Sequence, residues 1–329
     1  MMRHGESGHL IADRRKYSRD RIPVIHMLII TAVRGWEKER SITMLPRCLV
    51  TGCMATSILM VMIYAAPCNL AHAQGRLKAQ YIASVAGIPV GDGDWAVTIS
   101  EKEYSAEVTG RATGLLSLIT SGEGSVVVQD TVVHGRPSAM RYLANVEYSS
   151  KVIFKKTATV EMDFDSGTVK HFVIEPSNPP SRKNISVTEE HRRGIIDPVT
   201  ALLIPVASTG DVLVPNACDR TLPIFDGTRR FNLALSFKRM EEIQSDRGYR
   251  GPAIVCNVNF QPIAGYDPNR FAVKYLMNSH DIEMWLTPIA GTHILVPFRI
   301  SFPTTIGTAV LQAKEFVAVA QGPSTPTSR

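Results

Sequence analysis

The sequence predicts a mainly β protein, in which residues 76–320 form a single antiparallel curved sheet or barrel-like domain with one short buried helix. Short runs rich in β-branched and aromatic residues recur from Lys78 onward, separated by turn residues. No internal repeat or long linker divides this region, and its size suits one barrel or one large sheet. An apolar leader with a cleavage pattern precedes it, which indicates export.

Residues 44–73 have the parts of a secretory signal peptide. Arg47 supplies a positive charge, and an apolar run follows over residues 49–66. Small residues at positions 71 and 73 predict cleavage between Ala73 and Gln74. The signal peptide places the domain in the periplasm.

An uncleaved leader is the alternative, in which residues 49–66 anchor the chain in the inner membrane. The domain lies outside the cytoplasm in both interpretations, and we expect contact with a membrane only through this segment. Residues 1–43 have no assigned role. They precede the true start if translation begins at Met44, or they form a cytoplasmic tail ahead of an anchor.

The charge distribution argues against nucleic acid as a partner. The whole chain has a net charge of +6, but residues 1–73 contain ten Lys and Arg against five Asp and Glu. The remaining chain contains 26 basic and 25 acidic residues, so it is nearly neutral. A nucleic-acid surface needs a basic excess to neutralise phosphates, and the mature domain lacks one in bulk.

Turn residues divide the first series of predicted strands, which ends at Glu175. Gly-rich residues 87–93 are expected to connect the first two strands, and residues 122–124 are expected to form another turn. The expected strands of this series are residues 81–86, 95–99, 104–109, 125–129, 130–133, 141–149, 152–156, 157–164 and 169–175.

The expected helix lies at residues 198–204. Asp197 can cap it, Pro198 suits its first position, and Pro205 ends it after about two turns. Apolar residues occupy most of its faces, so we expect it to be buried against the sheet.

Strands resume after this helix, and Asp226-Gly227 is a strong hairpin turn signal between the first two. The expected strands are residues 218–225, 229–238, 253–260, 275–278, 281–288, 293–302 and 307–319. Residues 321–329 are rich in Pro, Ser and Thr and are expected to be a disordered tail.

Cys218 and Cys256 are the two cysteines outside the leader, and an oxidising compartment favours a disulfide between them. Two separate buried thiols are the alternative. No histidine lies between them in a ligand pattern, so the sequence predicts neither a metal site nor a cofactor.

The sequence predicts no enzyme, because it contains no recognisable catalytic motif. Asp163 and Asp165 share one face of a strand and could serve acid–base chemistry or weak Ca²⁺ binding. The following Ser166-Gly167 favours a solvated turn instead, and we assign no catalytic residue.

Four segments together resemble an uncharacterised family of exported proteobacterial proteins, domain of unknown function 3108. The most telling is Asp226-Gly227 followed by Arg229-Arg230, a possible structural turn motif, although Thr228 stands where another basic residue is expected. The other segments are residues 81–91, 197–202 and 251–256. The resemblance implies a β-rich, barrel-like envelope protein and no accepted activity.

These observations lead to a functional hypothesis, a non-enzymatic periplasmic protein that binds a lipid or another apolar ligand in a barrel-like groove. The first alternative is a structural scaffold with a packed interior, whose partner is an envelope protein. A cell-wall-directed enzyme ranks last.

Overall fold

The fold is one long antiparallel sheet that bends back on itself. The structure, a computed structural model, describes residues 74–114, 117, 120–133, 136–150, 156–176, 182–207 and 210–321. Residues 1–73 lie outside the described residues, as do residues 322–329 of the tail. The expected signal peptide or membrane anchor and Ala73 of the expected cleavage site fall in the first of these segments. No helix in the described part of the chain is both long and apolar enough to cross a bilayer.

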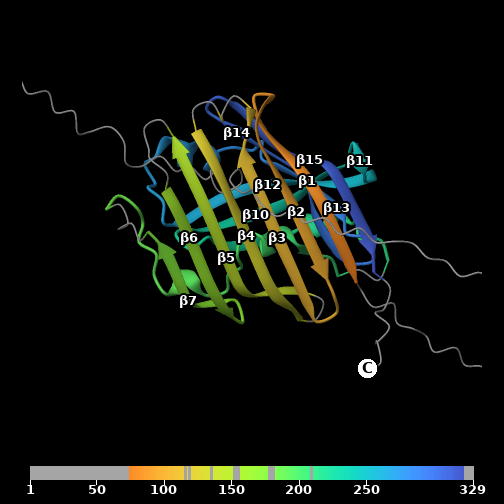
Figure 1. Ribbon diagram of the computed structural model, residues 1–329, viewed down its shortest axis with the longest axis horizontal. Coiled ribbons are helices and arrows are strands. Elements are labelled where there is room, and N and C mark those ends of the chain that lie inside the picture. The colour runs from red at the N-terminus through yellow and green to blue at the C-terminus, as the bar shows by residue number, and fades with distance from the viewer. Residues whose placement is uncertain are drawn as a thin grey trace, which may run out of the picture.

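The N-terminal half of the sheet is a meander in which each strand pairs with the next one in sequence. Its strands are β1 (Gly75–Val85), β2 (Ile88–Ile99), β3 (Glu103–Ala112), β4 (Thr120–Val133), β5 (Arg136–Ser150), β6 (Lys156–Asp165) and β7 (Thr168–Glu175). Figure 1 shows these strands face-on as a row of tilted arrows. Along β1, Leu77, Ala79 and Tyr81 are buried and alternate with exposed residues, so this half turns one apolar face inward.

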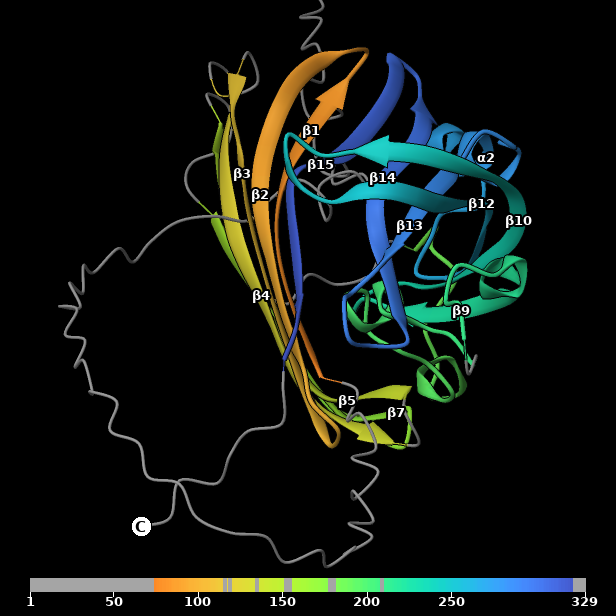
Figure 2. The same ribbon diagram turned by 90° about the vertical axis from the view of Figure 1, so that its right-hand side faces the viewer.

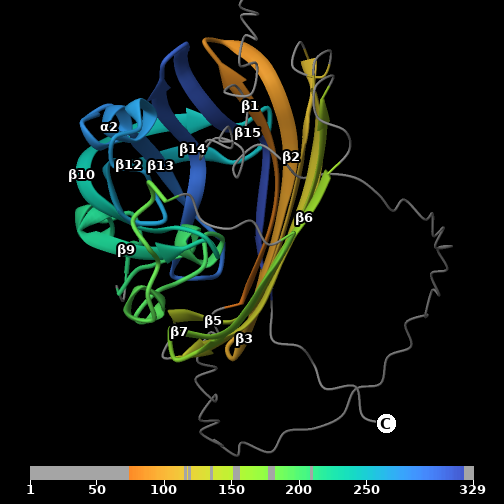
Figure 3. The ribbon, with the colours of Figure 1, turned by 90° about the vertical axis from the view of Figure 1, so that its left-hand side faces the viewer.

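The C-terminal half continues the sheet from β1. Its main strands, in sheet order, are β15 (Gly307–Ala320), β14 (Ile294–Thr304), β13 (Glu283–Pro288), β12 (Arg250–Ala264), β10 (Arg230–Gln244) and β9 (Arg220–Phe225). The short strands β8 (Ile204–Pro205) and β11 (Arg247–Gly248) pair with β14 and β15. Figure 2 shows the N-terminal half edge-on as a tall curved layer, with the C-terminal half on its concave side. Figure 3 shows the same arrangement from the opposite direction.

The sheet does not close into a barrel, because β7 and β9 end it without pairing to each other. Residues 194–197 connect the two ends instead. The backbone N–H of Ile195 donates to the carbonyl of Gly167 after β6 (2.9 Å), and that of Ile196 donates to the carbonyl of Pro223 on β9 (2.9 Å). The expected curved, barrel-like antiparallel architecture is therefore confirmed in its open form.

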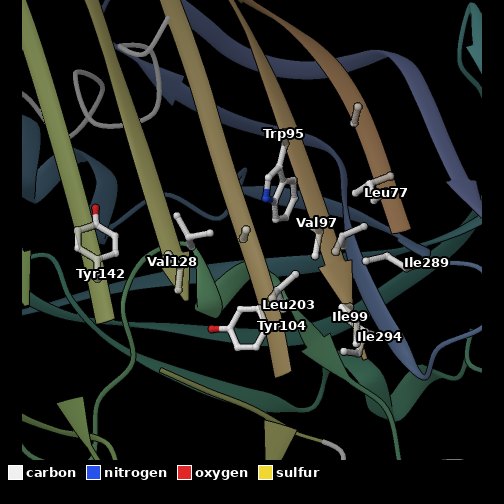
Figure 4. Packing of buried hydrophobic residues seen from close by; sticks show 14 of the residues in the cluster. Leu77, Trp95, Val97, Ile99, Tyr104, Val128, Tyr142, Leu203, Ile289 and Ile294 are labelled. Atoms are coloured by element: carbon white, nitrogen blue, oxygen red, sulfur yellow. The ribbon is translucent and has the colours of Figure 1, made fainter. Parts of the chain in front are cut away.

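Two large apolar clusters fill the interior. The first joins the inner face of the N-terminal half to β14 and contains Leu77, Trp95, Val97 and Phe298; Figure 4 shows part of it. The second lies within the C-terminal half, around residues such as Ile254 and Leu286. Each fully buried large side chain contributes about 1.5–3 kcal/mol, so these clusters are the main source of stability.

The disulfide between Cys218 and Cys256 is present, as expected. Cys218 ends the 3₁₀ helix η4 (Pro215–Cys218), and Cys256 lies on β12. Their Cα atoms are 5.5 Å apart and both side chains are fully buried. The bond ties the segment before β9 to a strand two positions away in the sheet.

The expected two-turn helix at residues 198–204 is wrong in length. The structure forms only the 3₁₀ turn η3 (Thr200–Leu202). Asp197 does cap it, accepting hydrogen bonds from the backbone N–H groups of Val199 (2.9 Å) and Thr200 (3.0 Å). The turn ends early because residues 204–205 pair with β14 as strand β8, which requires an extended backbone.

An α-helix occurs where residues 275–278 were expected to form a strand. It is α2 (Phe271–Met277), and it packs against β12 and β14. Val273 is buried and Leu276 is half-buried, a spacing of three that fits a helix face and not a strand. A segment of seven residues is too short for its sequence to distinguish the spacing of a helix from that of a strand.

Two expected turns are in fact strand. Residues 88–93 belong to β2, and the reversal from β1 needs only Ala86 and Gly87, both with positive φ (49° and 79°). Residues 122–124 lie within β4. In both places the glycines lie inside strands.

Candidate binding site

Three rows of inward residues cross the N-terminal half. The first contains Leu77, Val97, Ala106, Val128, Tyr142 and Met162, and the second contains Ala79, Trp95, Val108, Val126, Ala144 and Val160. The third row begins with Tyr81, which pairs with Gly93; Gly93 pairs with Gly110, and Gly110 pairs with Gly124. We call Gly93, Gly110 and Gly124 the glycine row. Gly93 is required for close packing of the strands, since an added Cβ atom would lie 2.3 Å from the backbone oxygen of Thr109 on β3.

A cavity of about 110 Å³ adjoins the glycine row. Its lining includes Gly93 and Gly110 of the glycine row, Tyr81 and Trp95, and the acidic residues Asp92 and Asp94. The lining is mostly apolar, and none of its residues is Lys, Arg or His. We call this space the first cavity.

A second cavity of about 160 Å³ lies within the C-terminal half. Its walls are mainly aliphatic and aromatic and include Phe231, Leu233, Val258, Phe260, Met284 and Phe302. Asp226 and Arg229 are its charged lining residues. Pro198, Leu202 and Ile300 line both cavities, so the two spaces adjoin at these three residues.

Trp95 lines the first cavity, and its indole nitrogen is itself a covered polar atom. Trp95 is only 5% exposed, and its Nε1–H has no hydrogen-bond partner among the described residues. The neighbouring Tyr81 is different, because its hydroxyl donates to the carbonyl of Pro297 on β14 (2.6 Å). Burial raises the pKa of Tyr81, so its hydroxyl stays protonated as that donor.

Tyr142 lines the first cavity from β5 and is almost completely buried. Burial raises the pKa of its hydroxyl well above the ordinary value, and the charges of Asp197 and Asp226 raise it further. The carboxyl groups of Asp197 and Asp226 thus act on the hydroxyl of Tyr142 at this end of the first cavity.

Asp226 organises the turn between β9 and β10. Its Oδ1 accepts hydrogen bonds from the backbone N–H groups of Thr228 (2.8 Å) and Arg229 (2.6 Å). Its Oδ2 lies 3.8 Å from the Arg229 guanidinium, which also lies 5.6 Å from the ring centroid of Tyr266. Arg230 donates to the backbone carbonyl of Phe231 (2.6 Å). These residues thus hold the turn in place beside the second cavity.

Gly227 brings this turn into contact with the N-terminal half. Its φ is +92°, and a Cβ atom there would lie 2.6 Å from Cγ1 of Val160 on β6. The position therefore requires glycine for both its backbone conformation and its close packing.

Asp197, Thr200 and Tyr104 form a buried polar cluster between the halves. The Asp197 carboxylate accepts a short hydrogen bond from the hydroxyl of Thr200, and that hydroxyl lies 2.5 Å from the hydroxyl of Tyr104 on β3. Burial raises the pKa of Asp197 although its hydrogen bonds to Thr200 and Val199 act to lower it. This cluster fixes η3, which carries Leu202 at the junction of the two cavities.

The structure places Asp163 and Asp165 away from both cavities. Asp163 lies 4.0 Å from the Arg141 guanidinium and 3.7 Å from the His171 ring, and Asp165 lies 3.6 Å from the Lys170 ammonium. Their inward neighbours are buried, so the two carboxylates lie on the outer face of β6. The described residues contain no cluster of three or more His, Cys, Asp or Glu that could hold a metal ion.

Sequence reasoning did not identify the glycine row or Trp95 as parts of a site. Each glycine lies two positions from an inward residue of its own strand, and this spacing in the sequence indicates that the glycine is on the inner face. Their alignment across three strands depends on the strand register, which the sequence does not give directly.

None of the curated proteins matches the chain. Among solved structures, the chain is similar to a β-barrel-like protein of the domain of unknown function DUF1849 from Brucella abortus, with 6% identity and a TM-score of 0.43. That match covers 75% of this chain and 98% of the other. The family described as "Protein of unknown function (DUF3108)" matches residues 80–314, most of the chain, and the chain therefore belongs to this family.

Proposed function

We propose that this protein is a non-enzymatic periplasmic envelope protein that binds an apolar ligand, a lipid chain, between the two halves of its sheet. The observation that carries the proposal is the pair of apolar cavities that adjoin at Pro198, Leu202 and Ile300. Pockets lined mostly by apolar side chains with a few polar groups are typical of small-molecule sites.

The size of the cavities limits the ligand. Their volumes of about 110 and 160 Å³ are below the ~300–1,000 Å³ that usually encloses a whole small molecule. A single acyl chain spanning both spaces fits this limit better than a lipid with several chains. The head of such a ligand would remain outside.

The periplasmic location is part of the proposal. The leader pattern in residues 44–73 and a buried disulfide between Cys218 and Cys256 support it, because disulfides persist in oxidising compartments. An inner-membrane anchor formed by residues 49–66 would leave the domain in the same compartment.

The test is to purify the protein from the periplasm and look for bound lipid by native mass spectrometry. We expect a retained acyl lipid, and added lipid at a hundred times its Kd would stabilise the fold by about 2.7 kcal/mol in thermal unfolding. Leu202→Trp fills the junction and should abolish both signals. Ile306→Trp, at an exposed position that lines neither cavity, should leave them unchanged.

A scaffold with a packed interior is the second candidate, favoured by the small size of the cavities relative to the two core clusters. Three results together would support the scaffold and contradict the binding proposal. They are the absence of bound lipid, the absence of a thermal shift across a lipid panel, and a Leu202→Trp variant that is more stable than the wild type.

A further inference from the structure

Two turns at one end of the sheet expose apolar side chains. They are residues 86–89, where β1 turns into β2, and residues 305–308, where β14 turns into β15. Every residue of both segments is exposed. Ile306, at 76%, is the most exposed large apolar side chain of the described residues, and Ile88 is 47% exposed.

The two turns lie against each other. The backbone N–H of Ala86 donates to the carbonyl of Thr308 (2.9 Å), and the neighbouring Val85 pairs with Ala309. Figure 2 shows both turns at the upper end of the sheet. They therefore form one continuous surface, residues 86–89 with residues 305–308, which we call the paired turns.

The sequence around the paired turns contains no charge. Residues 79–91 and 300–313 have no Asp, Glu, Lys, Arg or His, although charged residues make up 20% of the chain. Other turns of the sheet do carry charges, such as Lys102 between β2 and β3 and Arg229 between β9 and β10. Turns that face water are usually polar, so an uncharged, exposed pair of turns indicates a surface that meets an apolar phase.

The strands that carry the paired turns also line the cavities. Ala83 on β1 and Leu311 on β15 pair with each other and line the first cavity. Phe302 on β14 lines the second cavity. Each of these residues lies three positions from an exposed turn residue, which is about 10 Å of extended chain. The paired turns thus mark the end of the molecule at which both cavities come near an exposed apolar surface.

The size of this surface favours a bilayer over a protein partner. Each turn exposes four residues, whereas one side of a stable protein interface needs roughly 20–30. A bilayer accepts small apolar elements in its interface, to a depth of about 5–10 Å. It is also the phase in which acyl chains reside.

We propose that the paired turns insert Ile88 and Ile306 into the surface of a phospholipid bilayer, and that an acyl chain passes between the bilayer and the cavities at this end. Passage of the acyl chain rests on the proposed function, whereas the membrane contact rests on the turns alone. The contact is separate from any that the leader makes through residues 49–66.

The first measurement is cosedimentation of the protein purified from the periplasm with vesicles of phosphatidylcholine and phosphatidylglycerol. We expect Ile88→Ser/Ile306→Ser to weaken binding roughly tenfold or more, because two large apolar side chains no longer enter the bilayer. The matched control is Val133→Ser/Val319→Ser. Both valines are 48% exposed and lie toward the opposite end of the sheet, so this variant should bind as the wild type does.

The second measurement reports which part of the surface touches the bilayer, whether or not the leader holds the chain on the vesicle. Ile306→Trp places a fluorophore at the tip of one turn. Its emission should shift to the blue on vesicles and be quenched by brominated acyl chains, whereas Val133→Trp should show neither change. The wild type supplies the baseline, since its Trp95 and Trp285 are buried.

Two results would each overturn the membrane contact: equal vesicle binding by Ile88→Ser/Ile306→Ser and the wild type, or an Ile306→Trp emission that vesicles leave unchanged. A wild type that self-associates without vesicles, and loses this in the turn variant, would also overturn it, because the turns would then meet a second copy of the chain.

The passage of the acyl chain and the proposed function are tested apart from the contact. Transfer of monomyristoylglycerol from vesicles to the protein should slow roughly tenfold in Ile88→Ser/Ile306→Ser, in proportion to the lost contact, and an unchanged rate would overturn entry at this end. Thermal stabilisation by added monomyristoylglycerol should be equal in the variant and the wild type, since neither isoleucine lines a cavity. Its absence in both, with vesicle binding intact, would overturn the proposed function and leave the membrane contact standing.

Discussion

The two halves of the sheet bury their strands in different ways. In the N-terminal half, buried residues alternate with exposed ones, and the outer face of β3–β6 has an open polar hollow of about 450 Å³. In the C-terminal half, residues 253–256 of β12, 284–287 of β13 and 294–298 of β14 are buried in unbroken runs. These strands have apolar contacts on both faces, whereas the N-terminal half has them on one.

This difference assigns separate roles to the halves. Two-sided burial and the disulfide make the C-terminal half the more strongly stabilised part of the fold. The N-terminal half contributes one inner face, on which Gly93 and Gly110 of the glycine row line the first cavity. We therefore expect changes in the C-terminal half to affect stability most, and changes at the contact between the halves to affect the cavities.

Loss of the disulfide should have the largest effect. The loop between Cys218 and Cys256 spans 38 residues, and the loop-entropy model gives about 4 kcal/mol for closing it. We expect the Cys218→Ala/Cys256→Ala variant to lose roughly this free energy of unfolding in urea titrations, since both side chains are also fully buried.

The tryptophans show whether the loss spreads across the sheet. With Trp36 replaced, Trp285→Phe leaves Trp95 to report on the N-terminal half, and Trp95→Phe leaves Trp285 to report on the C-terminal half. We expect both reporters to shift together, because β1 and β15 join the halves over eleven paired residues. A shift of the Trp285 signal alone would show that the halves unfold separately.

Some elements of the sheet are easier to predict from the sequence than others. Alternation in residues such as Phe231, Leu233 and Leu235 identified the β9–β10 hairpin, and Asp226-Gly227 identified its turn. The glycines at 87–93 and 122–124 misled the prediction, because glycine inside a strand and glycine in a turn look alike in sequence.

The site was less predictable than the fold. The junction depends on η3, whose length is set by pairing of residues 204–205 with β14, a contact distant in sequence. The alignment of the glycine row and the position of Trp95 beside a cavity depend likewise on register and packing between distant strands. The disulfide was predictable because only two cysteines lie outside the leader.

Gly227 tests the contact between the halves, with a smaller expected effect. Gly227→Ala places a methyl group 2.6 Å from Cγ1 of Val160 and strains a φ of +92°. We expect a loss of about 1–3 kcal/mol in the free energy of unfolding.

Two variants separate the causes of that loss. Gly87→Ala changes a glycine with φ +79° and no neighbour within 4 Å of the added methyl group, so it measures backbone strain alone. Adding Val160→Ala to Gly227→Ala should recover the part due to the clash. If Gly227→Ala costs no more than Gly87→Ala, the turn does not pack tightly on β6.

The pH dependence of stability should reveal Asp197. Burial holds the pKa of Asp197 above its ordinary value of 3.8, so the folded state keeps the proton to a higher pH than the unfolded state does. The contribution of Asp197 to stability is complete below that ordinary value and is lost as pH rises through the raised folded pKa. Within this window each pH unit costs up to about 1.4 kcal/mol.

Asp197→Asn should remove this loss. The asparagine oxygen still accepts the hydrogen bonds of Val199 and Thr200, and the variant has no carboxyl group to titrate. Urea midpoints measured from pH 3.8 upward should therefore fall less steeply than in the wild type. Asp163→Asn, which removes an exposed carboxylate on the outer face of β6, should keep the wild-type slope. Equal slopes in all three proteins would mean that Asp197 ionises as freely in the folded state as in the unfolded one, and that η3 is solvated at the junction of the cavities.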